Sequence, residues 1–273
     1  MKKTILVFRH GPSRYLQSNK PCLIDEAADL SMPALTEPES PDEYYRRRAE
    51  ARKLVRSSAR SSFVHLRKDE PAAIWSSPTG RTLDTAKIIL YELYRQEVKP
   101  AALPRITPLD NLTEVRNFEW NLFLPLALGG EVECDGIRFA IDPRKSNPQG
   151  LGFGEYFFQN ILHMIPRAIK DEWPESYVKR IESFEPAMLV RKRMLGVLKT
   201  CLEDKEISQF ILVTHDALTG FLAHIFTDDK ENELPKGGFA VLESEGDELF
   251  IKVIGANTSG NSRANVFEHA LQN

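Results

Sequence analysis

The chain has 273 residues, of which 42% are hydrophobic and 27% charged, so a wholly disordered or fibrous protein is excluded. The formal net charge of −3 gives no overall attraction to polyanions, and we expect neither a specific nucleic-acid partner nor a membrane. Three scattered cysteines without CxxC spacing argue against a disulfide framework or a zinc site. We therefore expect a soluble, cytoplasmic, globular protein.

Short buried strands alternate with helical patterns along the chain. This order predicts a three-layer α/β/α sandwich around a mainly parallel central sheet, with an antiparallel strand at the C-terminus. Strands are predicted over 4–8, 72–75 and 210–214, and a C-terminal hairpin over 238–243 and 248–254. Helices are predicted over 41–66 (with Ser40 as the N-cap), 78–95, 186–202 and 218–226.

A segment with different composition interrupts this alternation from about residue 121 to residue 175. It is rich in glycine and proline and has weak periodicity. We interpret it as a loop-rich inserted lobe that roofs the site, within a single catalytic domain spanning 1–273.

Two histidines stand where buried strands end. Arg9-His10-Gly11 follows the first strand, and His215 follows the strand at 210–214. The carboxyl ends of parallel strands meet at one edge of a sheet, so His10 and His215 are expected to lie together. Gly11 would allow unusual backbone angles and a close approach to a ligand. A single such histidine is often structural, but two at matching positions indicate a site.

An arginine lies at the same expected edge. In Ser76-Ser77-Pro78-Thr79-Gly80-Arg81 the strand ends, the serines form a turn or cap, and Arg81 enters the first helical turn. A cation there opposes the helix dipole, which favours an anionic ligand over capping. The alternative is an exposed arginine on an amphipathic helix.

Four motifs in order resemble the histidine phosphatase superfamily, also called phosphoglycerate mutase-like. The resemblance covers roughly residues 4–90, 109–120 and 184–244. It implies the phosphoglycerate mutase-like fold and a metal-independent phosphoric monoester hydrolase that needs no cofactor. The motifs are Arg9-His10-Gly11, Ser76-Ser77-Pro78-x-x-Arg81-Thr82-x-x-Thr85-Ala86, Leu112-x-Glu114 and Val213-Thr214-His215.

The resemblance also implies roles for individual residues. His10 would be the nucleophile, with Arg9, Arg81 and His215 around the phosphate and Ser13 and Arg14 binding substrate. Glu114 would be the general acid and base, with Glu119 as the alternative, because Val115-Arg116-Asn117 replaces the glycine-rich continuation common in relatives. Two further departures are Pro12, and Asp216 where relatives usually have glycine.

These residues predict hydrolysis of a phosphomonoester through a phosphohistidine on His10, acting on a small phosphorylated substrate or a phosphoprotein. One alternative is phosphoglycerate mutase-type phosphoryl transfer. It is disfavoured because Leu16 occupies a position where mutases of this family typically have asparagine. Another alternative is a weakly catalytic phosphate-binding or scaffold protein.

Arginines recur every four residues in the first long helix, forming a basic stripe of Arg48, Arg52, Arg56 and Arg60. The stripe is either a docking face for an acidic partner or a solvated helix face whose charge is balanced elsewhere. The sequence does not set the oligomeric state.

Overall fold

The computed structural model describes residues 1–12, 41–101, 105–150, 173–215, 218–219, 222, 234–254 and 266–267. The chain forms two compact units: unit 1 consists of Met1–Glu114 and Arg193–Asn273, and unit 2 of Val115–Lys192. Helix α7 (Ala187–Glu203) begins in unit 2 and ends in unit 1. Within the described ranges, no helix is long and apolar enough to cross a membrane.

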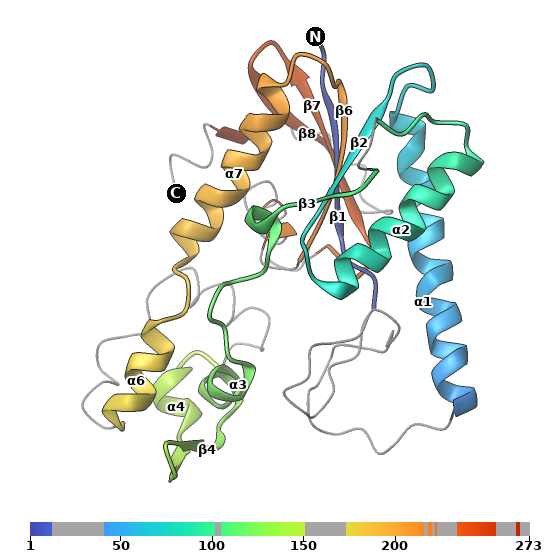
Figure 1. Cartoon of the computed structure of the whole chain (residues 1–273). Helices are drawn as coiled ribbons and strands as arrows, with labels where there is room; N and C mark the ends of the chain where they lie inside the picture. Colours follow the sequence, from blue (N-terminus) through green and yellow to red (C-terminus); the bar gives the residue numbers. More distant parts are fainter. Residues whose placement is uncertain are drawn as a thin grey trace. The chain divides into compact units, whose positions relative to one another are not determined.

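Unit 1 contains a six-stranded sheet in the order β3-β2-β6-β1-β7-β8 (Figure 1). Strands β1, β2, β3 and β6 run parallel, and β7 and β8 continue the sheet as an antiparallel edge. The predicted mainly parallel sheet is confirmed, and its antiparallel part contains two strands. The strands are β1 (Thr4–Arg9), β2 (Ala72–Ser76), β3 (Thr107–Pro108), β6 (Gln209–Thr214), β7 (Phe239–Glu245) and β8 (Glu248–Ile254).

Helices cover both faces of this sheet. Helices α1 (Pro41–Ser62) and α2 (Gly80–Arg95) lie on one face, and the unit 1 part of α7 lies on the other (Figure 1). Leu6 and Phe8 of β1 join Val55 of α1 and Ile89 of α2 in one buried apolar cluster, because alternate residues of a strand point to the same face. The predicted three-layer α/β/α sandwich is therefore confirmed.

Two helix boundaries differ from the sequence prediction. Helix α1 ends at Ser62, and a 3₁₀ turn (Phe63–His65) follows in place of its last predicted turn. The Ser62 hydroxyl donates to the carbonyl of Ala59, the kind of local bond that competes with helical hydrogen bonding. Helix α2 begins at Gly80, with Thr79 as its N-cap residue in an extended conformation. The proposed Ser40 cap and most of the predicted 218–226 helix lie outside the described residues.

Unit 2 is broader than the lobe predicted from composition, and it contains regular structure. Its hydrogen bonds include one from the buried Tyr177 hydroxyl to the Leu122 carbonyl at 2.6 Å, which joins two of its helices. Residues 151–172 lie outside the described part, and the interpretation as an insertion within one domain stays a prediction. The described elements are α3 (Trp120–Leu128), β4 (Gly130–Cys134), β5 (Ile137–Ile141), α4 (Pro143–Ser146) and α6 (Glu175–Glu182).

Part of the basic stripe has a structural role. Glu92 of α2 is fully buried, and the Arg60 Nε donates to its carboxylate at 2.7 Å. Arg56 Nε lies 3.6 Å from the other carboxylate oxygen. These two arginines therefore compensate a buried charge and join α1 to α2. A docking role for the stripe stays a prediction, and the side chain of Arg48 lies outside the described part.

Candidate active site

The register of the central strands brings the two histidines together. Arg9 at the end of β1 lies opposite Thr214 at the end of β6, and the His10 amide donates to the Thr214 carbonyl at 2.9 Å. His10 and His215 therefore follow directly from paired positions. Their ring centroids are 5.3 Å apart, in an edge-to-face arrangement. The expectation that the two strand ends meet is confirmed.

Gly11 is needed for a reason that differs from the sequence expectation. Its φ is not in the left-handed region, so unusual backbone angles do not explain the glycine. A Cβ at this position would lie 2.6 Å from Cγ2 of Val55 on α1, well inside van der Waals contact. The Gly11 amide also donates to the Thr85 hydroxyl at 3.0 Å. Close packing of the β1 turn against α1 and α2 therefore requires glycine here.

A hydrogen bond to the backbone determines which ring nitrogen of His10 carries the lone pair. Its Nδ1 lies 2.7 Å from the Gly11 carbonyl oxygen, which can only accept, so Nδ1 carries the proton and Nε2 holds the lone pair. Burial, followed by the positive charges of Arg81, Arg9 and Lys236, lowers the pKa of His10 well below its usual value against the opposing effect of the Gly11 hydrogen bond. His10 is therefore neutral at neutral pH, with its lone pair on Nε2.

His215 is held in the opposite tautomer. Its Nε2 donates to the Ser77 hydroxyl at 2.9 Å, while its Nδ1 accepts from the Arg81 guanidinium. Its pKa lies well below the usual value, first because of burial and then because of the electrostatic effects of Arg81, of a proton on His10, and of Arg193 and Arg9. The His215 ring is thus neutral, and hydrogen bonds at both nitrogens fix its orientation.

Arg81 connects His215 with the predicted acid. Its Nη2 lies 3.0 Å from His215 Nδ1 and also donates to the Glu114 carboxylate, forming an ion pair. The Glu114 Oε2 atom is 3.7 Å from His215 Nδ1. The side chains of Arg81 and Glu114 are 11% and 18% exposed, so solvent reaches the pair. The structure therefore gathers a cation and a carboxylate beside the two histidines.

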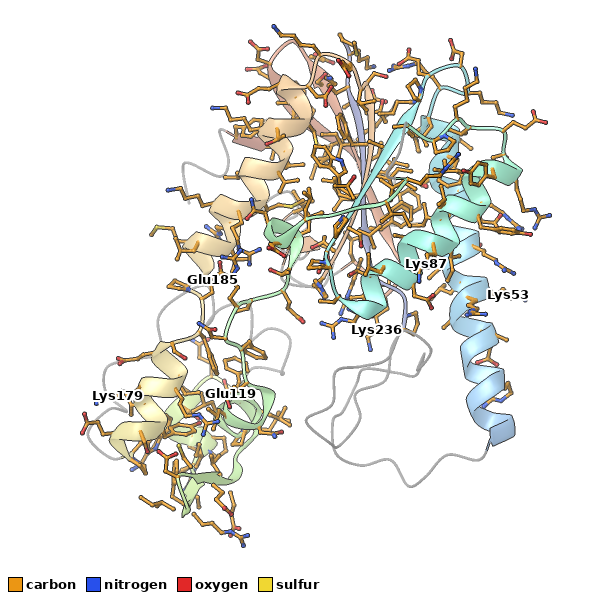
Figure 2. The ribbon with its side chains drawn as sticks, in the orientation of Figure 1. Lys53, Lys87, Glu119, Lys179, Glu185 and Lys236 are labelled. Atoms are coloured by element: carbon orange, nitrogen blue, oxygen red, sulfur yellow. The ribbon has the colours of Figure 1, made fainter. Side chains whose placement is uncertain are left out.

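The turn at residues 234–238 also binds the backbone of Arg9 and His10. The Gly237 amide donates to the His10 carbonyl at 2.9 Å, and the Arg9 amide donates to the Gly238 carbonyl at 3.0 Å. The guanidinium of Arg9, which is 8% exposed, donates to the Leu234 carbonyl at 2.7 Å. Lys236 lies on this turn (Figure 2), which explains why its charge acts on His10.

The other residues singled out in the sequence lie outside the described part of the chain or in unit 2. Ser13, Arg14 and Asp216 lie outside the described residues. Glu119, the alternative acid, belongs to unit 2, where its carboxylate forms an ion pair with Arg180 whose Nε–Oε1 distance is 3.0 Å. The assignment of roles to the gathered residues stays a prediction, and Glu114 is the acid that the structure places beside them.

Three site residues were overlooked in the sequence. Ser77 and Thr85 belong to the motif around Arg81, but nothing in that motif indicates that their hydroxyls bind His215 and Gly11. Arg193 of α7 belongs to no motif, and its charge nevertheless acts on His215. Among the described side chains, no group of three or more His, Cys, Asp or Glu is placed to hold a metal. Metal independence stays a prediction.

Comparisons with known proteins give a likeness of fold. No family model matches the chain, and no curated protein matches it in sequence. The structure of Bacillus stearothermophilus YhfR aligns with a TM-score of 0.51 at 17% identity, covering 94% of this chain and 98% of that one. A putative alpha-ribazole-5'-P phosphatase from Escherichia coli aligns at 12% identity with a TM-score of 0.49, covering 94% and 98%. A phosphoglycerate mutase from Bacillus anthracis aligns at 12% identity with the same TM-score, covering 99% and 96%. The likeness to YhfR confirms the fold that the motifs imply.

Proposed function

We propose that the chain hydrolyses phosphomonoesters through a phosphohistidine intermediate on His10. The observation that carries the proposal is the state of His10, whose Nε2 lone pair is fixed by the Nδ1–Gly11 hydrogen bond. Burial and neighbouring cations keep this ring neutral. A neutral imidazole is a nucleophile that needs no separate base, and the cations that lower its pKa are also suited to bind phosphate oxygens.

In the first step, the Nε2 lone pair of His10 forms a bond to phosphorus as the bond to the ester oxygen breaks. Arg9, Arg81 and His215 surround the position of the phosphoryl group, where fixed charges offset the charge of the transition state. An arriving phosphate competes with Glu114 for the Arg81 guanidinium. Once it is released from Arg81, the Glu114 carboxylate takes up a proton from solvent, and it gives this proton to the departing ester oxygen.

In the second step, water attacks the phosphorus of the phosphohistidine. The Glu114 carboxylate takes a proton from this water, the N–P bond breaks, and its electron pair returns to Nε2 of His10. Inorganic phosphate leaves, and Glu114 regains the proton that it lost in the first step. Both half-reactions therefore use the same carboxyl group in opposite directions.

Product analysis separates this proposal from its two alternatives. Purified protein is incubated with phenyl phosphate and, separately, with 3-phosphoglycerate, and both free phosphate and 2-phosphoglycerate are measured. We expect free phosphate to form, and His10→Asn to abolish its release while His65→Asn, outside the site, does not. Formation of 2-phosphoglycerate faster than free phosphate would instead support a mutase. Phosphate binding without turnover of either compound would support a binding or scaffold protein.

A further inference from the structure

Glu114 lies on a short irregular segment, so its position depends on contacts made by other elements. The segment begins with a 3₁₀ turn (Asp110–Leu112), and Glu114 itself is in neither a helix nor a strand. Its ion pair with Arg81 is the bond that an incoming phosphate must disturb. A general acid contributes fully only when its proton is held within hydrogen-bonding distance of the leaving oxygen. Something other than Arg81 must therefore hold Glu114 while substrate is bound.

The Arg193 side chain provides this support from α7. Its Nη1 donates to the carbonyls of Asn111 at 2.8 Å and Thr113 at 3.0 Å, and its Nη2 donates to the Glu114 carbonyl at 3.2 Å. One guanidinium thus binds the backbone carbonyls of three residues within the segment 111–114. The planar fork of arginine suits several fixed acceptors at once, which a lysine ammonium does not reproduce.

A second contact joins the same segment to the site. The Thr214 hydroxyl donates to the Leu112 carbonyl at 2.7 Å, and Thr214 directly precedes His215. The acid-bearing segment is therefore bound to α7 and to the end of β6, and neither bond involves the Glu114 carboxylate. Both can persist when phosphate occupies Arg81.

We propose that Arg193 is a positioning residue for the general acid, and that it acts through the backbone of the segment 111–114. This inference rests on the proposed hydrolysis. Arg193 makes no contact with the reacting atoms in this account. It keeps the Glu114 carboxyl group in place after the Arg81 ion pair opens. Its loss should therefore resemble a partial loss of Glu114, with little effect on phosphate binding.

The dependence on the leaving group distinguishes this role from general structural support. An alkyl phosphate needs a proton on its departing oxygen, whereas 4-nitrophenyl phosphate releases a stable anion that needs little protonation. General acid catalysis is worth about 10²–10⁴-fold, so misplacing the acid should cost an alkyl phosphate about 10–100-fold in kcat. The loss with 4-nitrophenyl phosphate should stay below about 3-fold, because the acid contributes little there.

The test compares Arg193→Met with Lys199→Met in the full chain. Lys199 lies on the same helix and pairs with Glu203 one turn away, so the control removes the same charge without touching the segment. We expect Arg193→Met to show the selective loss with alkyl phosphate and an unchanged inhibition constant for inorganic phosphate. Lys199→Met should match the wild type. Arg193→Lys should recover part of the alkyl phosphate activity, because an ammonium can reach some of the carbonyls.

The double variant Arg193→Met/Glu114→Gln shows whether the two residues act together. If Arg193 acts through Glu114, adding Arg193→Met to Glu114→Gln costs little further activity with alkyl phosphate. Equal losses on both substrates, or full additivity in the double variant, would overturn the inference. Should Arg193→Met fail to fold, Thr214→Val removes the second bond to the segment, and the same selective loss is required of it.

Failure of the proposed function gives a different result. A wild-type protein that releases no phosphate from any monoester would refute hydrolysis itself. A wild-type protein that is active, with an Arg193→Met variant that loses activity uniformly, would refute only the positioning role.

Discussion

Acidification should destabilise unit 1 because both site histidines are buried in the neutral form. The pKa values of His10 and His215 are well below the usual value, chiefly through burial and the charge of Arg81. Unfolding returns each ring to water, where its pKa is about 6.5. Below that pH the unfolded chain binds protons that the folded chain does not. The stabilising contribution of each histidine is therefore complete above pH 6.5 and is lost as the pH falls toward the folded-state pKa.

The size of this effect follows from proton linkage. Well below pH 6.5, each buried histidine should lower the free energy of unfolding by about 1.4 kcal/mol per pH unit. The pair together should approach about 2.7 kcal/mol per pH unit over the same range. Hydrogen bonds from Ser208 and Arg67 lower the pKa of Glu70, and at Glu243 burial, which raises the pKa, is outweighed by hydrogen bonds from Lys2 and Lys252. The stability that these carboxylates contribute is lost only as the pH falls to about 4.5 and below. Between pH 6.5 and 5 these carboxyl groups therefore contribute little. His65, whose pKa is also lowered by burial, contributes equally to the wild type and to a His10 variant.

Urea unfolding followed by Trp75 fluorescence measures this slope for unit 1. Trp75 of β2 packs edge-to-face on Phe210 of β6 at 4.9 Å, whereas the other two tryptophans belong to unit 2 and are replaced by Trp120→Phe and Trp173→Phe. His10→Asn is compared in this background, because an asparagine amide can take the place of the Nδ1 donor. We expect the slope of the variant to be shallower by about 1.4 kcal/mol per pH unit.

If the free energy of unfolding fell equally with pH in the wild type and in His10→Asn, His10 would have the same pKa in the folded and unfolded chain. The proposed effect of burial on His10 would then be wrong. A matching experiment uses His215→Gln, whose amide can replace the Nε2 donor toward Ser77. The same reduction in slope is required of it.

Three further predictions address neighbouring groups. Arg81→Ala should weaken inhibition by inorganic phosphate about 10–100-fold, since a charge-assisted hydrogen bond contributes about 1.5–3 kcal/mol, and an unchanged inhibition constant would remove Arg81 from the phosphate site. Gly11→Ala should lower the free energy of unfolding by about 1–3 kcal/mol through the clash with Val55, and Val55→Ala should recover part of this loss if the steric cause is right. Lys236→Met should raise the pKa of His10, because a neighbouring positive charge is removed, and should move the acid limb of the kcat/KM profile to higher pH. A profile identical to the wild type would show that Lys236 does not act on His10.

The layers of the fold could be predicted because the strands are short, apolar and separated by helices. Residues 4–8 and 210–214 are continuous apolar runs, which is typical of parallel strands buried on both faces. Their ends had to meet once they were placed side by side. Adjacency of His10 and His215 therefore followed from periodicity and chain order alone.

Contacts between distant elements could not be predicted in the same way. Nothing in the sequence around Gly11 shows that Val55 approaches it, because this distance depends on how α1 packs on the sheet. Arg193 is one of several basic residues on α7, and its three carbonyl partners become visible only in three dimensions. Arg56 and Arg60 of the basic stripe pair with the buried Glu92. From sequence alone, these arginines could equally belong to a docking face or to a solvated helix face.

Unit 2 was predicted least well. Its glycines and prolines weaken the periodicity on which strand and helix predictions depend. Hairpin β4–β5 turns at Asp135 and Gly136, both with positive φ, a conformation that glycine accepts readily and that aspartate tolerates better than most residues. The turn was present in the sequence as Asp-Gly, but the flanking strands are too exposed to show a clear alternation.

Trapping the phosphorylated protein is the direct test for a phosphohistidine on His10. The wild-type protein and His10→Asn are mixed with a labelled phosphomonoester, quenched in denaturant within one turnover, and digested to locate the label. We expect a stoichiometric label on His10 of the wild type that is stable in base and lost in acid, and no label on His10→Asn. Label on a serine or cysteine, or steady hydrolysis by His10→Asn, would contradict it.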